Sequence, residues 1–205
     1  MTTMIEKGIV TPEELLAMPD AVNYELVNGQ LVERSMGTLS SWIGGEIHGQ
    51  LRNFVREHSL GWVFPADQGY QCFADDPMKV RKPDASFVAA ARLSAEQMPE
   101  GYLSIAPDLA VEVLSPNERA LEVEWKVREY LTAGVRLVWI VNPETRMVRV
   151  HRADRTVAEA QETEELDGED VVLGFRTPVQ SLFPAKTPAR QRTQVDQLAS
   201  TSSDC

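Results

Sequence analysis

Glu112 is a carboxylate in the middle of an almost wholly apolar run that begins at Pro107 and ends at Pro116. A continuous apolar run of this length, bounded by prolines, is typical of a strand buried on both faces. Burying an ionised carboxylate is costly unless the group is paired, protonated or bound to a metal. Glu112 therefore needs a partner, which the neighbouring elements must supply.

Asp84 is the first candidate partner. It stands near the start of a second strand-like segment, 82–88, in which Pro83 occupies a position where strands tolerate proline. A sequence separation of 28 residues (112 − 84) leaves room for a loop that brings two strands side by side. Two carboxylates on adjacent strands suit Mg²⁺ or Mn²⁺ better than Zn²⁺. Structural explanations also exist: turn chemistry at a strand start for Asp84, and an ion pair for Glu112.

Lys126 is the third candidate. It lies on a helix predicted from about 118 to 133, directly after the strand of Glu112. At about 100° per residue, Lys126 is the one cation on its arc and could reach back to that carboxylate. The other residues on this arc include Val123, Val127, Tyr130 and Ala133. Leu121 and Trp125 fall on the opposite face, and a lone lysine commonly just extends along apolar surface.

Three local patterns predict the elements before the first acid. Thr11-Pro12-Glu13-Glu14 has the capping residues of a short helix. Asn28-Gly29 separates two strand-like runs, 24–27 and 30–33, and predicts a two-residue hairpin turn. Apolar residues recur at helical spacing between Ser40 and His58, so a long amphipathic helix should cover one face of a sheet.

The segment after Glu112 predicts a crossover connection. A continuous apolar run, Val135–Val141, follows the predicted helix at once, and strand–helix–strand units of this kind join parallel strands in a right-handed sense. Met147–Val150 alternates and should be a more exposed antiparallel neighbour. Further short strands are predicted at 62–64, 70–73, 156–158 and 171–173, with an acidic loop over 162–170 and a last packed turn at Leu182-Phe183.

The composition fits one soluble domain. The chain has 205 residues, of which 43% are hydrophobic and 25% charged. Its net charge of -11 argues against a protein that coats nucleic acid through a basic surface, but not against an enzyme with a local basic groove. Cys72 and Cys205 are too few for a disulfide framework or a cysteine zinc site. We expect one domain over 1–184, a disordered tail over 185–205, no membrane span and a cytoplasmic location.

Other charged residues receive structural interpretations. Glu25 alternates with apolar neighbours in the hairpin and should be exposed, although it could add a further carboxylate to the site. Arg81-Lys82 could meet a phosphate or form a solvated entry to the strand of Asp84. Three histidines lack any pairing at ligand spacing and are expected to be structural: His48, His58 and His151.

A set of short motifs carries a family resemblance. The motifs are Arg81-Lys82-Pro83-Asp84, the run from Pro107 to Pro116, Lys126 with Tyr130, Ala133-Gly134-Val135 and Trp139-Ile140-Val141-Asn142-Pro143. Together they resemble the Uma family of endonucleases, in the PD-(D/E)XK, or restriction-endonuclease-like, superfamily. The resemblance covers about 11 to 183. It implies an α/β fold with a restriction-endonuclease-like mixed β-sheet flanked by helices and an N-terminal β-hairpin.

The resemblance also implies a catalytic site. Asp84 and Glu112, with the carbonyl of Val113, would be the ligands of Mg²⁺ or Mn²⁺. The superfamily motif would place a lysine two residues after the second acid, where this chain has Leu114. Similar proteins place a lysine on the following helix instead, and that position is Lys126.

Two positions depart from the family pattern. Glu122 stands where the family often has aspartate, which is a conservative difference. Ser40-Ser41 stands where the family often has a histidine, so an auxiliary role for that histidine has no counterpart in this chain.

The implied function is metal-dependent hydrolysis of phosphodiester bonds in DNA. The alternative is a catalytically inactive nuclease-fold binding or regulatory module, which the acidic balance favours over a nuclease that binds DNA unaided. In a third possibility, Glu112 and Lys126 merely form a buried ion pair in an interaction protein. A homodimer is expected by analogy, because nucleases of this fold often pair two sites to cut two strands.

Overall fold

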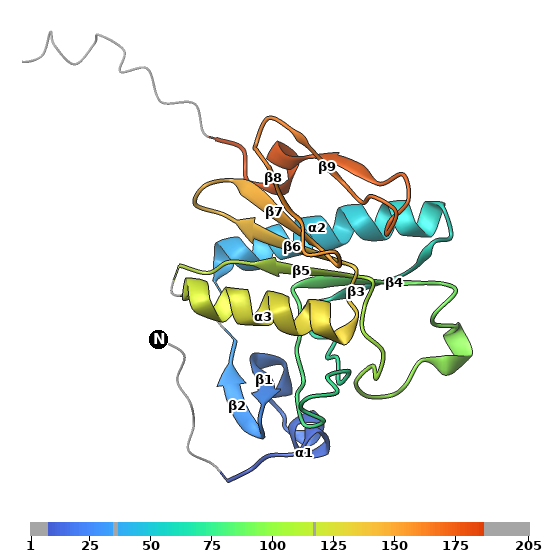
Figure 1. Ribbon diagram of the computed structural model, residues 1–205, viewed down its shortest axis with the longest axis vertical. Coiled ribbons are helices and arrows are strands. Elements are labelled where there is room, and N and C mark those ends of the chain that lie inside the picture. Colours follow the sequence, from blue (N-terminus) through green and yellow to red (C-terminus); the bar gives the residue numbers. More distant parts are fainter. Residues whose placement is uncertain (1–7, 35–36, 117, 187–205) are drawn as a thin grey trace, which may run out of the picture.

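A six-stranded sheet forms the centre of the molecule (Figure 1). The computed structural model describes residues 8–34, 37–116 and 118–186. The strands lie in the order β3-β4-β5-β6-β7-β8 across the sheet. Their bounds are β3 Gly61–Pro65, β4 Ala85–Ala89, β5 Leu109–Val113, β6 Leu137–Asn142, β7 Met147–Arg152 and β8 Val157–Ala160.

The sheet is mixed, as expected. β5 and β6 are parallel, whereas every other neighbouring pair is antiparallel. The connection from β5 to β6 runs through the helix α3, Ala120–Ala133, and this confirms the predicted crossover. Gly134 caps the C-terminus of α3, and its φ of 100° is in the left-handed region that glycine adopts most easily.

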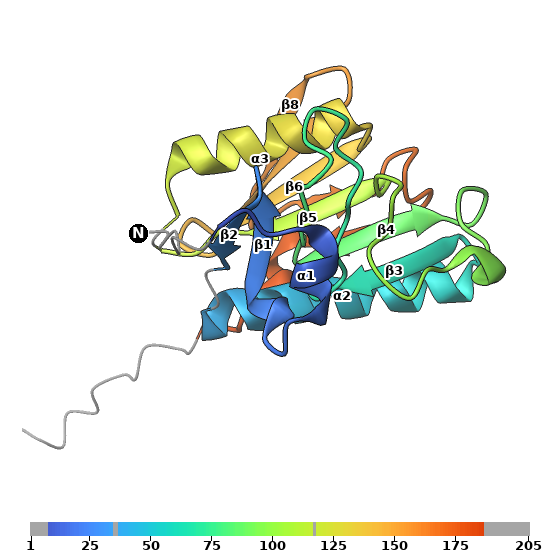
Figure 2. The same ribbon diagram turned by 90° about the horizontal axis from the view of Figure 1, so that it is seen from below.

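Two helices cover the two faces of the sheet (Figure 2). The long helix α2, Thr38–Glu57, buries Ile43, Ile47 and Leu51 in one core together with alternate residues of β5. The α3 helix packs Val127 and Tyr130 in a second core on the other face. This second core contains Ala110 of β5, so alternation along the strand directs Glu112 toward α3.

The N-terminal hairpin lies at one edge of the sheet structure (Figure 1). Its strands are β1, Tyr24–Val27, and β2, Gln30–Glu33. The predicted turn is confirmed, because Asn28 and Gly29 have φ values of 50° and 71°, as hairpin turns with two left-handed residues require. Leu26 and Val80 exchange two backbone hydrogen bonds of 2.9 and 2.8 Å, and these attach the hairpin to the segment that leads into β4.

The remaining elements are short. The predicted N-terminal helix is present as α1, Pro12–Ala17, with the Thr11–Glu14 capping box. Short 3-10 helices occur at Ala21–Asn23, Ala95–Gln97 and Val179–Leu182, and the last of these is the predicted turn on the core. A small second hairpin joins β9, Glu165–Asp167, to β10, Arg176–Pro178.

Three local predictions are wrong. The run 70–73 is not a strand: Tyr70 forms only isolated bridges with Arg81 and Leu103. The run 171–173 is a turn, in which Val171 and Val172 are buried and bond back to the carbonyl of Gly168. The acidic segment 162–170, expected to be a loop, contains β9. Apolar composition indicated burial at 70–73 and 171–173, but burial does not require strand pairing.

Two expectations concern the ends and the surroundings of the chain. The predicted disordered tail, 185–205, lies outside the described residues from position 187 onward. Among the helices of the described residues, none has the length and apolar character needed to cross a membrane.

Adjacent glycines of α2 offer a matched test of this packing. Gly44 is buried, and a Cβ there would lie 3.3 Å from the Cβ of Asp84, whereas a Cβ at Gly45 would meet nothing within 4 Å. Gly45→Ala should raise the free energy of unfolding by about 1 kcal/mol, because alanine is the better helix former. In Gly44→Ala the same gain should be offset by an overpacking cost of about 1–3 kcal/mol. Urea unfolding measures both, and equal stabilisation by the two variants would contradict the packing of α2 on Asp84.

Candidate active site

Asp84 and Glu112 lie at the same end of the β4–β5 pair. Ala85 pairs with Val111, so Asp84, which precedes Ala85, and Glu112, which follows Val111, are brought together by the antiparallel register. The Asp84 carboxylate has two protein partners. Its Oδ2 accepts the Val113 N–H at 2.7 Å, and its Oδ1 lies 3.3 Å from Nη2 of Arg34. The structure therefore juxtaposes the two predicted acids.

Glu112 is held by two side chains of α3. Lys126 Nζ lies 3.0 Å from Oε2 of Glu112, and the Tyr130 hydroxyl donates to Oε1 at 2.6 Å. Glu112 is only 6% exposed. The predicted orientation of α3 is confirmed, because Lys126 and Tyr130 face the sheet while Leu121 and Trp125 are 53% and 54% exposed.

Lys126 is surrounded by carboxylates. Besides Glu112, its Nζ lies 3.4 Å from Glu118 and 3.9 Å from Glu25. Burial alone would lower the pKa of Lys126, but these three acids raise it well above its usual value. Lys126 is therefore a permanent cation at neutral pH, able to donate hydrogen bonds and to offset negative charge but not to accept a proton.

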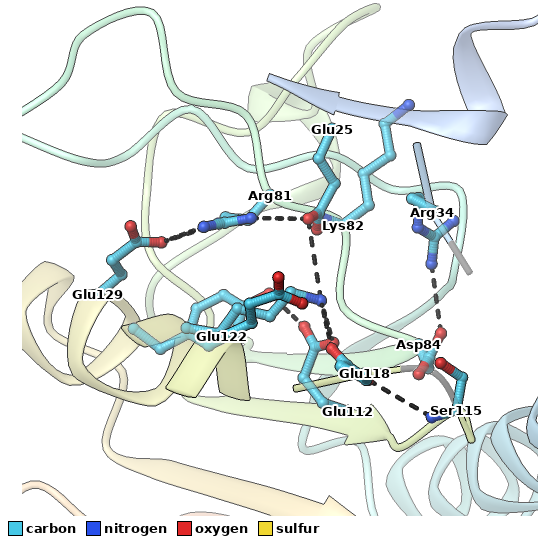
Figure 3. Close-up of polar contacts among 12 residues, drawn as sticks. Glu25, Arg34, Arg81, Lys82, Asp84, Glu112, Ser115, Glu118, Glu122 and Glu129 are labelled. Carbon is cyan, nitrogen blue, oxygen red and sulfur yellow. Dashed lines mark hydrogen bonds and ion pairs between the residues drawn. The ribbon is translucent and has the colours of Figure 1, made fainter. Parts of the chain in front are cut away.

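The expectation that Glu25 is exposed is wrong. Glu25 is 2% exposed, its Oε1 accepts the Lys82 N–H at 2.8 Å, and its Oε2 pairs with Arg81 at 2.8 Å (Figure 3). Burial acts to raise the pKa of Glu25, yet Lys126 and Arg81 together bring it down to about 2. Glu25 is thus an ionised acid beside the candidate site. Alternation along β1 shows only on which face of the hairpin Glu25 lies. It does not show that a segment some 55 residues later in the chain covers this face.

Arg81 and Lys82 are likewise buried, so the idea of a solvated strand entry is wrong. Arg81 joins Glu25 to Glu129 of α3, with an Nη2–Oε2 distance of 2.7 Å to the latter. Lys82 donates from Nζ to the carbonyl of Ala21. The buried ion pairs connect the hairpin, the entry to β4 and α3 around the site (Figure 3). Because two acids pair with Arg81, it presents no free charge to a phosphate, whereas the Lys82 ammonium is bonded to a neutral carbonyl.

Burial raises the pKa values of both predicted acids. For Glu112, desolvation outweighs the attraction of Lys126, and the charges of Asp84 and Glu25 add to the effect, so its pKa rises to about 7. For Asp84, burial also raises the pKa, while the Val113 N–H and Arg34 oppose the rise. Carboxylates whose pKa values are shifted by burial and by neighbouring charges are enriched at functional sites.

The donor set fits a hard divalent cation. Mg²⁺ is commonly held by one or two carboxylates, with water and substrate phosphates completing its coordination. Asp84 and Glu112 supply the carboxylates, and the Val113 peptide lies beside them because its N–H bonds to Asp84. The Ser115 hydroxyl, two residues further, is buried without a hydrogen-bond partner in the described part of the chain. Within that same part, no three His, Cys, Asp or Glu side chains are grouped to hold a metal, so the fit is to a two-carboxylate site.

Sequence reasoning missed three neighbours of the acids. Tyr130 was placed on the correct arc, but its bond to Glu112 was not predicted. Arg34 follows β2 with no motif around it, and Ser115 lies in the run from Pro107 to Pro116 without a predicted role of its own. His48 lies on α2, His58 directly follows it, and His151 lies on β7. His48 and His151 are half-buried, and their pKa values are lowered mainly by burial. None of the described contacts of His48, His58 or His151 is to Asp84 or Glu112.

A solved structure shares the fold of this chain. The chain resembles a crystal structure described as a "putative nuclease belonging to DUF820 from Anabaena variabilis ATCC 29413". The TM-score is 0.72 at 20% sequence identity, with 85% of this chain and 97% of that chain covered, and this likeness shows a shared fold. No curated protein matches the chain.

The family comparison covers most of the chain. The family model Uma2, described as "Putative restriction endonuclease", matches residues 12–180, a span that includes the hairpin, both acids and α3. This chain therefore belongs to the Uma2 family.

Proposed function

We propose that this chain is a metal-dependent endonuclease that hydrolyses phosphodiester bonds of DNA. The observation that carries the proposal is the pair of acids at one end of β4 and β5, with Lys126 Nζ 3.0 Å from Glu112. Membership of a family described as restriction endonucleases supports a nuclease-like function. The acids fit Mg²⁺ or Mn²⁺, which would polarise the phosphate of the substrate and lower the pKa of a bound water.

The residues of the chain then have separate roles. Asp84 and Glu112, with the Val113 carbonyl, would hold the cation. Tyr130 would fix the orientation of Glu112 through its 2.6 Å hydrogen bond. Lys126, which stays protonated, would orient the nucleophile or offset the negative charge that develops on the phosphate.

The proposal extends to the setting of the enzyme. Two copies could present two sites to the two strands of a duplex, so we propose a homodimer. We also propose that the protein is cytoplasmic. A homodimer would elute from a sizing column at twice the mass of the 22.9 kDa chain.

One observation favours a second candidate, a catalytically inactive binding or regulatory module. All four carboxylate oxygens of Asp84 and Glu112 have protein partners: Arg34, the Val113 N–H, Lys126 and Tyr130. A site satisfied in this way could persist without a cation. Calorimetry with Mn²⁺ separates the two functions, because a nuclease site binds the ion and loses it in Glu112→Gln.

Removal of either acid should abolish cleavage. Asp84→Asn and Glu112→Gln keep the shape of each side chain but remove its charge, so Mg²⁺- or Mn²⁺-dependent cleavage of duplex DNA should disappear while the fold remains. Glu159→Gln is the matched control, since Glu159 pairs with Arg149 on the exposed part of the sheet. Gel assays of DNA cleavage test this, and an Asp84→Asn protein as active as the wild type would refute the proposed function.

The dependence of stability on pH should reveal the burial of Glu112. Because the folded-state pKa of about 7 lies above the usual 4.5, Glu112 stabilises the fold at pH below about 4.5, and this contribution is lost as pH rises through 7. With a chelator present, the wild type should therefore lose more free energy of unfolding between pH 5 and 8 than Glu112→Gln does. Urea unfolding across this range measures the difference. Parallel profiles would mean that Glu112 titrates normally.

A further inference from the structure

We infer that Arg34 is a phosphate-binding residue of this site, and that it stays paired with Asp84 until Asp84 binds a cation. In this inference the guanidinium neutralises Asp84 when no cation is bound. When Asp84 instead binds the cation, the same guanidinium is free to bind a phosphate oxygen of the substrate. The inference rests on the proposed function and adds to it a substrate contact made by the hairpin.

The Arg34–Asp84 contact is weak compared with the other arginine pairs nearby. Its single Nη2–Oδ1 distance is 3.3 Å, whereas Arg81 lies 2.8 Å from Glu25 and 2.7 Å from Glu129. Charge-assisted hydrogen bonds between such groups are usually about 2.7–2.9 Å long. Arg81 is thus fixed between two acids, whereas Arg34 makes one long contact to an acid among the described residues, and this contact can be exchanged.

Arg34 is nevertheless positioned by its backbone and by the hairpin. Its N–H donates to the carbonyl of Asn23 at 2.8 Å, and its Nη1 donates to the carbonyl of Val22 at 3.3 Å. The contacts of the guanidinium to Val22 and Asp84 use two of its five N–H donors. The side chain of Arg34 is 9% exposed and that of Asp84 is 26% exposed, so the pair lies at the edge of the interior where a ligand can approach.

The charges around the acids leave a role for this cation. Arg34, directly after β2, contacts Asp84 (Figure 3). Lys126 of α3 contacts Glu112, so each acid has its own cation. Arg81 is neutralised by Glu25 and Glu129, and Lys82 donates to the carbonyl of Ala21. In a chain of net charge -11, a bound phosphate needs local cations, and a planar guanidinium suits phosphate oxygens.

Substitution of Arg34 should therefore separate cation binding from cleavage. Arg34→Gln removes a positive charge that competes for Asp84, so the dissociation constant for Mn²⁺ should stay at the wild-type value or become smaller. The rate of DNA cleavage at saturating Mn²⁺ should fall at least about 100-fold, as expected for the loss of a group that stabilises transition-state charge. Arg34→Lys keeps the charge without the planar fork and should give an intermediate rate.

The experiment combines calorimetry with Mn²⁺, cleavage of a labelled DNA duplex and thermal unfolding of each variant. Arg149→Gln is the control, because Arg149 is 56% exposed and pairs with Glu159 away from the acids. If Arg34→Gln cleaves DNA at the wild-type rate, or if it loses Mn²⁺ affinity together with stability, Arg34 is only a structural partner of Asp84 and the inference is overturned. A wild type that neither binds Mn²⁺ nor cleaves DNA would overturn the proposed function and this inference with it.

Discussion

The contact between Glu112 and Lys126 is the interaction on which the rest of the site depends. A carboxylate in the middle of a buried strand must be neutralised or bonded, and here a lysine and a tyrosine from the next helix do both. This requirement fixes the face that α3 presents to the sheet.

Further buried ion pairs connect this pair to the N-terminal hairpin. Lys126 approaches Glu25 as well as Glu112, and Glu25 is in turn held by Arg81, which reaches back to Glu129 on α3. The N-terminal hairpin is thereby attached to the site by buried ion pairs as well as by the small apolar core around Leu26 and Val80. Removing one member would leave a buried charge without its partner, which is why such a network is costly to break. The hairpin also brings Arg34 to Asp84, and in our proposal this contact adds a substrate-binding group to the site.

Much of this could be predicted from the sequence because the signals were local. The Asn28-Gly29 turn, the crossover after Glu112 and the inward side of α3 all follow from turn chemistry or from helical and strand periodicity. The burial of Glu25 could not be predicted, since the segment that covers it is distant in sequence. Apolar runs at 70–73 and 171–173 were mistaken for strands because composition reports burial and not hydrogen-bond partners. Arg34 carried no signal, because its importance comes only from the position of Asp84.

A crystal structure of the wild type soaked in Mn²⁺ tests the central claim most directly, since the ion can be located by its anomalous scattering. The account predicts one ion between the carboxylates of Asp84 and Glu112, and no ion there in crystals of Glu112→Gln. The contrary result is that no ion is found at this position at Mn²⁺ concentrations that fill sites elsewhere, with Arg34 and Lys126 still bonded to the two acids. That result would contradict the account of a metal-dependent nuclease site.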